Sequence, residues 1–331
     1  MKKKIASAAK KVLGKKTYTK LRSKYVFNDL SSPFPMYQIK DIEMDWSTFE
    51  KSGGMTQVVY IVSPTQRSGT NFLSHVMGKH PDLVFPEKKK FSDEHCLYSY
   101  VNDIKKYCLS TVATWGKWTE SEDHTLVSQV KKLMANTGEG ILKYFSEDLQ
   151  EGQMLLLKTP DSGNVEDFFH LFPNSKVVVL MRDGRDTVES FLKSWGGSES
   201  FKKMTSRWSN RVDQIDRLLE RAKHSGFEKQ VHVLDYNNLN EDTPGELKKV
   251  FEFLELNQDN YPWGELADTP VLGSSNYRGG EENVHWKPIA KDSGFKPAGK
   301  WNDWNKSKKN LFKRIAGKQL QNHGFSKDND W

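Results

Sequence analysis

Short apolar runs alternate with amphipathic segments along most of the chain. The apolar runs predict buried β-strands at Val58–Val62, Met154–Lys158, Val177–Met181 and Val231–Asp235. Hydrophobic residues at helical spacing predict helices at Thr70–Lys79, Lys90–Ser110, Glu122–Leu149 (interrupted at 137–140), Val165–Leu171, Gly184–Trp195, Ser200–His224, Pro244–Leu256 and Ser307–His323. Strands that alternate with helices indicate an α/β fold with a central parallel sheet flanked by helices.

Two stretches lack a regular pattern. We expect residues 1–56 to form a basic N-terminal arm and lead-in, and residues 57–325 to form one globular domain. Within that domain, residues 257–305 are rich in Gly, Pro and Trp and predict long loops. Their aromatic and basic side chains either cover a nucleotide or anchor the loop to the core. Thr243 is the expected N-cap of the helix that starts at Pro244.

Composition narrows the class of protein. The chain has 331 residues, of which 36% are hydrophobic and 28% charged. No apolar run reaches the roughly 18 to 20 residues of a membrane span, and the basic N-terminus lacks the apolar core of a secretory signal. Cys96 and Cys108 fall in one expected helical region, where a disulfide would be strained, so we expect free thiols and a cytoplasmic protein.

The positive charge is concentrated at the N-terminus. Residues 2–24 carry ten Lys or Arg and no acid, in a chain of net charge +7. This segment is interpreted either as a solvated, frayed terminus or as peripheral contact with an anionic membrane. No nucleic-acid-binding motif accompanies it, so we expect no nucleic-acid partner.

Two strand-to-helix junctions carry the candidate chemistry. After the first strand, the loop residues Arg67-Ser68-Gly69-Thr70-Asn71 open into a helix, which is typical of a phosphate-binding site. The loop has one Gly, and Arg stands where a Walker A motif has Lys, which argues against the phosphates of ATP. After the third strand, Arg182 is followed eight residues later by Ser190, about two helical turns away. Two anion sites on parallel strands suit a nucleotide with phosphates at both ends.

These paired junctions resemble the signature of the PAPS-dependent sulfotransferases, and the resemblance runs from about Val58 to Phe325. It implies a P-loop NTPase-like architecture and the donor 3′-phosphoadenosine 5′-phosphosulfate (PAPS), with 3′-phosphoadenosine 5′-phosphate (PAP) as product. It also implies that Arg67 clamps the transferring group electrostatically, because Arg does not give up its proton. Donors to the 5′-phosphate would come from Ser68, Gly69, Thr70 and Asn71. Arg182 and Ser190 would bind the 3′-phosphate.

Further residues match the family less completely. Lys158, at the end of the second strand, resembles a second catalytic cation, but Pro160 stands where the cytosolic small-molecule branch has a catalytic His. Tyr236 resembles an aromatic residue near the adenine, although the acid of the family's Tyr-Glu-Asp-Leu string is missing. Asp183, Arg185 and Asp186 are expected to form a local ion-pair cluster that orients the turn after the third strand.

A carboxylate base is implied instead of the histidine. The stretch from His80-Pro81 to Glu87 resembles the glycan and tyrosyl-protein branches of the family, which makes Glu87 the first candidate base and Glu94 the second. A solvated surface role remains the alternative for each. Lys296 and Lys300 lie in a segment, Phe295–Trp301, that resembles the glycine-tryptophan loop contacting the 3′-phosphate. No metal-ligand spacing is present, so no metal is expected.

The sequence therefore predicts a sulfotransferase that moves the sulfuryl group from PAPS to a hydroxyl or amine of a small-molecule or glycan acceptor. One alternative is a P-loop-type small-molecule kinase, which ATP–Mg²⁺ binding would favour. Another is a non-catalytic protein that binds anionic glycan, which steeply salt-dependent polymer binding without nucleotide binding would favour.

Overall fold

The computed structural model describes residues 45–50, 57–86, 94–119, 123–194, 200–267, 269–270, 298–328 and 330–331. The chain divides into two compact units, one comprising Met1–Met44 with Lys105–Val130 and the other Asp45–Ile104 with Lys131–Trp331. Every site residue discussed below belongs to the second unit. The predicted domain boundary after residue 56 lies outside the described residues and stays a prediction.

A five-stranded parallel sheet organises the second unit. Its order is β2-β3-β1-β4-β5, and every neighbouring pair runs parallel. The strands are β1 (Val58–Val62), β2 (Leu83–Val84), β3 (Met154–Thr159), β4 (Lys176–Met181) and β5 (Val231–Asp235). The α/β prediction and the four predicted strands are confirmed to within one residue at each end. The two-residue strand β2 was too short for its pattern to predict.

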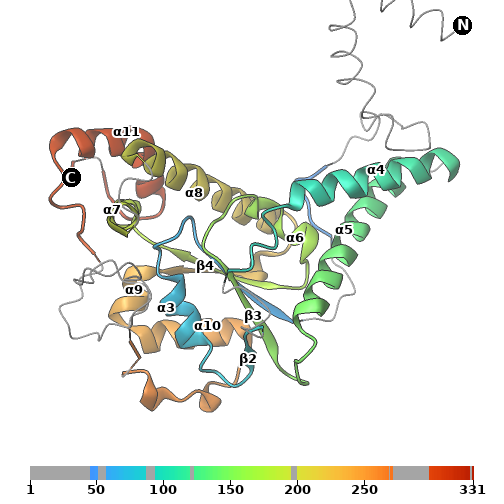
Figure 1. Ribbon diagram of the computed structural model, residues 1–331, viewed down its shortest axis with the longest axis horizontal. Helices are drawn as coiled ribbons and strands as arrows, with labels where there is room; N and C mark the ends of the chain where they lie inside the picture. The colour runs from blue at the N-terminus through green and yellow to red at the C-terminus, as the bar shows by residue number, and fades with distance from the viewer. Residues whose placement is uncertain are drawn as a thin grey trace, which may run out of the picture. The chain divides into compact units, whose positions relative to one another are not determined.

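Helices cover both faces of this sheet (Figure 1). On one face, α3 (Thr70–Met77), α9 (Tyr236–Glu241) and α10 (Thr243–Leu254) share an apolar core with Val59, Ile61 and Leu156. On the other face, Tyr60 packs its ring 5.3 Å from that of Phe168 in α6 (Phe168–Leu171). Consecutive residues of β1 thus point to opposite layers, as the pleat of a strand requires.

Three further helices come after β4 in the chain and pack against one another. They are α7 (Gly184–Ser194), α8 (Phe201–His224) and α11 (Lys306–Asn322). Figure 1 shows α8 and α11 side by side, and Trp208 of α8 is fully buried with its ring 6.1 Å from that of Phe312 in α11. This packing brings residues from near position 300 back to the end of β4.

Several predicted helix limits were wrong. The helix expected at Lys90–Ser110 is α4 (Val101–Thr119), so Cys96 precedes it. The break expected at 137–140 is absent from α5 (Asp123–Phe145), which is continuous there. A Cβ on Gly138 would lie 1.8 Å from the carbonyl oxygen of Leu171, so this Gly permits close packing and does not end the helix.

The start of α10 also differs from the prediction. Asp242, and not Thr243, is its N-cap, and its carboxylate accepts the N–H of Gly245 at 2.9 Å. Thr243 is the first helical residue, and its hydroxyl donates to the carbonyl of Leu239 at 2.7 Å. The short helix α9 directly before α10 was not predicted, because the six residues Tyr236–Glu241 carry too little periodicity.

Candidate functional site

The carboxyl ends of β1, β3 and β4 meet at one edge of the sheet. In register, Val62 lies between Thr159 of β3 and Val179 of β4. Lys158 precedes Thr159, and Arg182 directly follows β4. Ligands of open parallel sheets bind outside this edge, where loops replace the strands. The sheet topology therefore gathers basic residues from positions 67, 158 and 182.

The loop between β1 and α3 has an unusual backbone. Arg67 has φ 74° and Gly69 has φ 97°, both in the left-handed region. For Arg this conformation costs on the order of 1–2 kcal/mol, and such strain is characteristic of functional sites. The buried hydroxyl of Ser68 fixes the turn by donating to the carbonyl of Thr65 at 2.8 Å. Beyond the turn, the first N–H groups of α3 have no intrahelical acceptor, as at every helix start.

Gly69 is required by close packing as well as by its φ. A Cβ at this position would lie 2.2 Å from the ring of Tyr236. Tyr236 is 4% exposed, and the Arg182 guanidinium lies 4.4 Å from the centre of its ring. The Tyr236 ring therefore packs against both the loop and Arg182. Its contact with an adenine stays a prediction.

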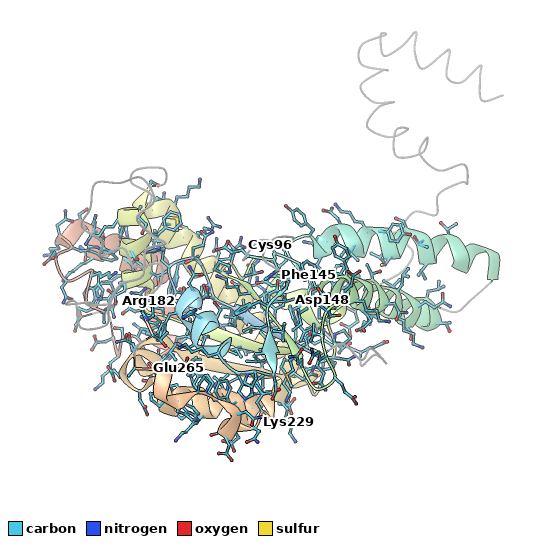
Figure 2. All side chains as sticks on the ribbon, turned by 60° about the horizontal axis from the view of Figure 1, so that its bottom comes forward. Cys96, Phe145, Asp148, Arg182, Lys229 and Glu265 are labelled. Carbon is cyan, nitrogen blue, oxygen red and sulfur yellow. The ribbon has the colours of Figure 1, made fainter. Side chains whose placement is uncertain are left out.

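Arg67, Arg182 and Ser190 form one connected group. Arg182 donates through Nη1 to the carbonyl of Arg67 at 2.5 Å. Arg67 in turn donates through Nε to the hydroxyl of Ser190 at 3.3 Å. The two predicted anion sites thus adjoin each other, joined through the left-handed turn at Arg67. In Figure 2 the Arg182 label lies beside the blue helix α3.

Lys300 joins this group from the C-terminal part of the chain. Burial and, after it, the charges of Arg182 and Arg67 together lower the pKa of Lys300 to about 7. Burial, with the charge of Arg182, lowers the pKa of Arg67 to about 10. The charged forms of Arg67 and Lys300, which burial and the charge of Arg182 destabilise, would gain from a nearby anion. The arrangement is suited to bind phosphate.

Lys158 lies at the same edge, beside the helix start. It is 6% exposed, and its ammonium donates a hydrogen bond to the Asn71 side-chain oxygen. Residues 94–96 run along this end of β3, where the N–H of His95 donates to the carbonyl of Lys158 at 3.0 Å. The N–H of Lys158 is donated to Nδ1 of His95 at 3.3 Å. The candidate base Glu94 thus directly precedes a residue that contacts Lys158.

The turn after β4 differs in part from the expected ion-pair cluster. Arg185 does pair with Asp183, at 2.6 Å between Nη2 and Oδ2. Asp186 instead accepts the backbone N–H groups of Lys300 at 2.6 Å and Gly299 at 3.2 Å. Sequence reasoning missed this contact because 113 residues separate Asp186 from Gly299. The one feature of the sequence that could have indicated a role for Asp186 is its position four residues before Ser190, on the same helix.

Several predicted residues lie outside the described part of the chain. They are Glu87, Lys296 and the basic arm at 2–24, so their roles stay predictions. The His80 of the His80-Pro81 pair is described, and Nε2 lies 3.0 Å from the carbonyl oxygen of Asn257. Nδ1 accepts the N–H of Asp82 at 3.2 Å, which fixes the proton on Nε2. His80 therefore joins the end of α3 to the loop after α10.

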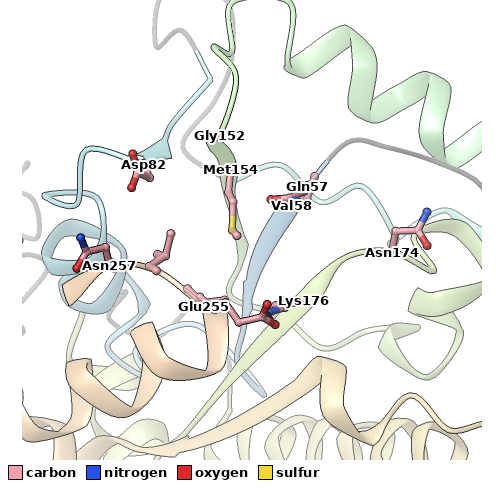
Figure 3. A pocket seen from close by; sticks show the side chains of 11 residues that line it. Gln57, Val58, Asp82, Gly152, Met154, Asn174, Lys176, Glu255 and Asn257 are labelled. Carbon is pink, nitrogen blue, oxygen red and sulfur yellow. Dashed lines mark hydrogen bonds and ion pairs between the residues drawn. The ribbon is translucent and has the colours of Figure 1, made fainter. Parts of the chain in front are cut away.

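A cavity of about 540 Å³ lies at the opposite, amino edge of the sheet (Figure 3). Its lining includes Val58, Met154 and Lys176, the first residues of β1, β3 and β4. Lys176 is paired there with Glu255 at 2.7 Å. The cavity is therefore separate from the basic group at the carboxyl edge.

Comparison with known protein families identifies the family of this chain. The model of the sulfotransferase family matches residues 59–260, which is more than half of the chain. The chain belongs to the sulfotransferase family. The match starts in β1 and includes the Arg67 loop, Lys158, Arg182 and Ser190, while Lys300 lies beyond it. The predicted family membership is confirmed, and sulfuryl transfer is the chemistry that it supports.

Individual relatives are distant. An uncharacterized protein of Aquifex aeolicus (strain VF5) is 23% identical over 202 residues, which are 60% of this chain and 25% of that protein. The chain thus spans about a quarter of the length of this curated relative. Among solved structures, the sulfotransferase domain of the curacin biosynthetic pathway aligns with TM-score 0.47 and 17% identity, over 81% of this chain and 98% of that one. A mouse sulfotransferase complexed with PAP aligns with TM-score 0.45 and 14% identity, over 84% and 88%.

Among the described residues, no group of three or more His, Cys, Asp or Glu is arranged to hold a metal ion. No helix in the described ranges is long and apolar enough to cross a membrane.

Proposed function

We propose that this sulfotransferase takes its sulfuryl group from PAPS and transfers it to a hydroxyl or amine of a small-molecule or glycan acceptor. The observation that carries the proposal is the convergence of Arg67, Arg182 and Lys300 from three distant segments. The lowered pKa values of Arg67 and Lys300, together with the nearby charge of Arg182, favour a ligand with more than one phosphate. PAPS carries a phosphosulfate at its 5′ end and a phosphate at its 3′ end, which matches two adjoining anion sites.

The 5′ end is assigned to the loop between β1 and α3. In the reaction, an acceptor oxygen attacks sulfur, the bond between sulfur and the bridging oxygen breaks, and PAP leaves with the electron pair. Negative charge therefore grows on the 5′-phosphate. It would be stabilised by Arg67, by the Lys158 ammonium, by the Thr70 hydroxyl and by the backbone N–H groups of Ser68, Gly69, Thr70 and Asn71. Lys158 is suited to this role because Asn71 holds its ammonium at the start of α3.

The 3′ end is assigned to Arg182, Ser190 and Lys300, and Lys296 and Tyr236 are proposed to add contacts. Arg182 can offer two parallel N–H donors to a phosphate, while Ser190 adds a neutral donor. Arg67 bonds Ser190 at 3.3 Å, so the two phosphate sites share a boundary. This boundary supports one ligand with two charged ends over two separate ligands.

The proton of the acceptor is assigned to a carboxylate. Glu94 is favoured among the described residues, because its neighbour His95 exchanges hydrogen bonds with the Lys158 backbone. A carboxylate within reach of the acceptor hydroxyl would take its proton as the oxygen attacks sulfur. Glu87 remains the alternative base. Parallel Glu87→Gln and Glu94→Gln variants separate the two, since only loss of the base should lower kcat while PAP affinity stays unchanged.

Calorimetric titration with PAP, AMP and ATP–Mg²⁺ tests the donor assignment. Wild type should bind PAP much more tightly than AMP. Arg182→Ala should weaken PAP binding about 10- to 100-fold, the value expected for a lost charge-assisted hydrogen bond. Lys176→Ala is the matched control, because it removes a cation from the other end of the same strand and should leave PAP binding unchanged.

The other outcomes are equally informative. A preference for ATP–Mg²⁺ would favour the kinase alternative. Absence of nucleotide binding, together with steeply salt-dependent binding of an anionic glycan, would favour the non-catalytic alternative. If PAP binds as expected, release of PAP from PAPS in the presence of a panel of hydroxyl and amine acceptors then identifies the acceptor class.

A further inference from the structure

The first turns of α7 hold a segment from the far end of the chain, residues 298–304, here called the Lys300 loop. Asp186 Oδ1 accepts the N–H of Lys300 at 2.6 Å, and Oδ2 accepts that of Gly299 at 3.2 Å. One turn further along α7, Glu189 accepts the indole N–H of Trp304 at 2.7 Å. The loop is therefore bound to α7 at both of its ends, and the tighter attachment lies directly on the backbone of Lys300.

Trp301 attaches the middle of the loop. The Arg185 guanidinium lies 3.9 Å from the centre of the Trp301 ring and 4.5 Å from that of Trp331. Arg185 is itself fixed by its ion pair with Asp183. The side chains at 185, 186 and 189 thus all serve this loop, while Arg182 and Ser190 flank them.

Asp186 is a buried carboxylate beside a predicted phosphate site, which is an unfavourable position for a negative charge. Asp186 is 2% exposed, and burial raises its pKa, as does the nearby charge of Asp183. A buried negative charge beside a phosphate site opposes an anionic ligand. Burial therefore disfavours the ionisation of Asp186, and its negative charge disfavours an anionic ligand. The hydrogen bonds that Asp186 accepts must compensate for both effects. Asp186 accepts hydrogen bonds from the backbone N–H groups of Gly299, which has φ 77°, and of Lys300.

We propose that Asp186 is a positioning residue that makes the donor site selective for a nucleotide with a second phosphate. By fixing the backbone of Gly299 and Lys300, it holds the Lys300 ammonium beside Arg182, where that phosphate would bind. The inference rests on the proposed donor site. It adds that selectivity for PAP over AMP depends on a contact that never touches the ligand.

The test is the ratio of the AMP and PAP dissociation constants in wild type, Asp186→Ala and Asp186→Asn. Asp186→Ala should lower this ratio about tenfold, the scale of one charge-assisted hydrogen bond, and leave AMP affinity within threefold. Asp186→Asn keeps one acceptor oxygen and should lower it less. The control is Asp242→Ala, which removes a carboxylate that also accepts a backbone N–H, at the start of α10. It should lower the melting temperature but leave the ratio unchanged.

A double-mutant cycle separates positioning from general damage. If Asp186 acts through Lys300, then Asp186→Ala should change the ratio little in a Lys300→Met background. Full additivity of the two substitutions would overturn the inference. So would tighter PAP binding in both Asp186 variants, because the carboxylate would then act only through its charge.

The two proposals can fail separately. If wild type binds AMP and PAP equally, the donor assignment itself is wrong. If wild type discriminates between them and folded Asp186→Ala discriminates equally well, only the positioning role is wrong. Should Asp186→Ala not fold, Asp186→Asn gives the same answer, because it preserves the shape of the side chain.

Discussion

The two edges of the central sheet use basic residues in opposite ways. At the amino edge, the lysine that begins β4, Lys176, pairs with Glu255 at 2.7 Å, and this contact lowers the pKa of Glu255. At the carboxyl edge, the same strand leads into Arg182, and burial together with the charge of Arg182 lowers the pKa values of Arg67 and Lys300. One edge compensates its positive charge within the protein, and the other accumulates it. Only an accumulated charge gives an anionic ligand a reason to bind, although the amino edge holds the cavity of about 540 Å³.

The largest effect should come from the lysine at the carboxyl end of β3. Lys158→Ala should lower kcat about 100- to 1000-fold, as expected when one group that stabilises the developing charge is lost. PAP affinity should fall much less, because the charge on the leaving phosphate is fully developed only as the bond breaks. Steady-state kinetics with PAPS measure kcat, and calorimetry measures PAP affinity. Lys176→Ala is again the control, and a similar loss of kcat in that variant would remove the distinction between the two edges.

The second effect compares two glycines, one at each edge. Gly69 and Gly152 both have positive φ, at 97° and 85°, so Ala at either position costs roughly 1–2 kcal/mol in backbone strain. Only Gly69→Ala also drives a Cβ to 2.2 Å from Tyr236, whereas no atom lies within 4 Å of a Cβ at Gly152. Gly69→Ala should therefore weaken PAP binding more than tenfold, since it displaces the ring that supports Arg182.

The measurement is calorimetry beside thermal melting. Gly152→Ala should lower the melting temperature but keep wild-type PAP affinity. If Gly69→Ala binds PAP as wild type does, the contact between the loop and Tyr236 does not shape the site.

The sequence predicts the local parts of the site better than the long-range contacts that bring them together. The strands, the Arg67 loop and Arg182 were predictable because each follows from a short local pattern, an apolar run that ends in polar residues. Lys300 was predicted only through family resemblance, and the contact with Asp186 was not predicted. That hydrogen bond joins residues 114 positions apart, and no local pattern records such a pairing.

Local patterns also failed where packing overrides propensity. Gly138 and Gly140 suggested a break in α5, but Gly138 lies directly against the backbone of Leu171. Thr243 suggested an N-cap, yet Asp242 takes that position, because either residue type is a good cap and the sequence alone does not choose. The carboxyl edge of the sheet was therefore predictable in its components, but its assembly depends on tertiary contacts.

The third effect is a pH dependence confined to the carboxyl edge. Lys300, with a pKa of about 7 in the free protein, is charged below that pH and loses its proton above it. A bound phosphate favours the charged form, so PAP affinity should fall as the pH rises from about 7 towards the higher pKa of the complex. Titrations at several pH values measure this fall. In Lys300→Gln the decline above pH 7 should be absent, and persistence of the same decline would assign it to another group.

The same lowered pKa acts on stability with the opposite sign. The free folded protein holds fewer protons on Lys300 than the unfolded chain does, between pH 7 and the ordinary lysine value of 10.5. Stability of the free protein therefore gains from this group as the pH rises through that window. Bound PAP should remove part of this gain, which denaturant titrations with and without PAP can measure.

The smallest effect is expected at the amino edge, where the charge is already compensated. Glu255→Gln removes the partner of Lys176, but the Glu255 side chain is 83% exposed, and exposed pairs contribute little. The melting temperature should change by about 2 °C or less, and both PAP affinity and kcat should match wild type. Thermal melting and calorimetry of this single variant suffice. A change in PAP affinity beyond threefold would mean that charge at the amino edge reaches the donor site through the strands, and the contrast between the two edges would then have to be abandoned.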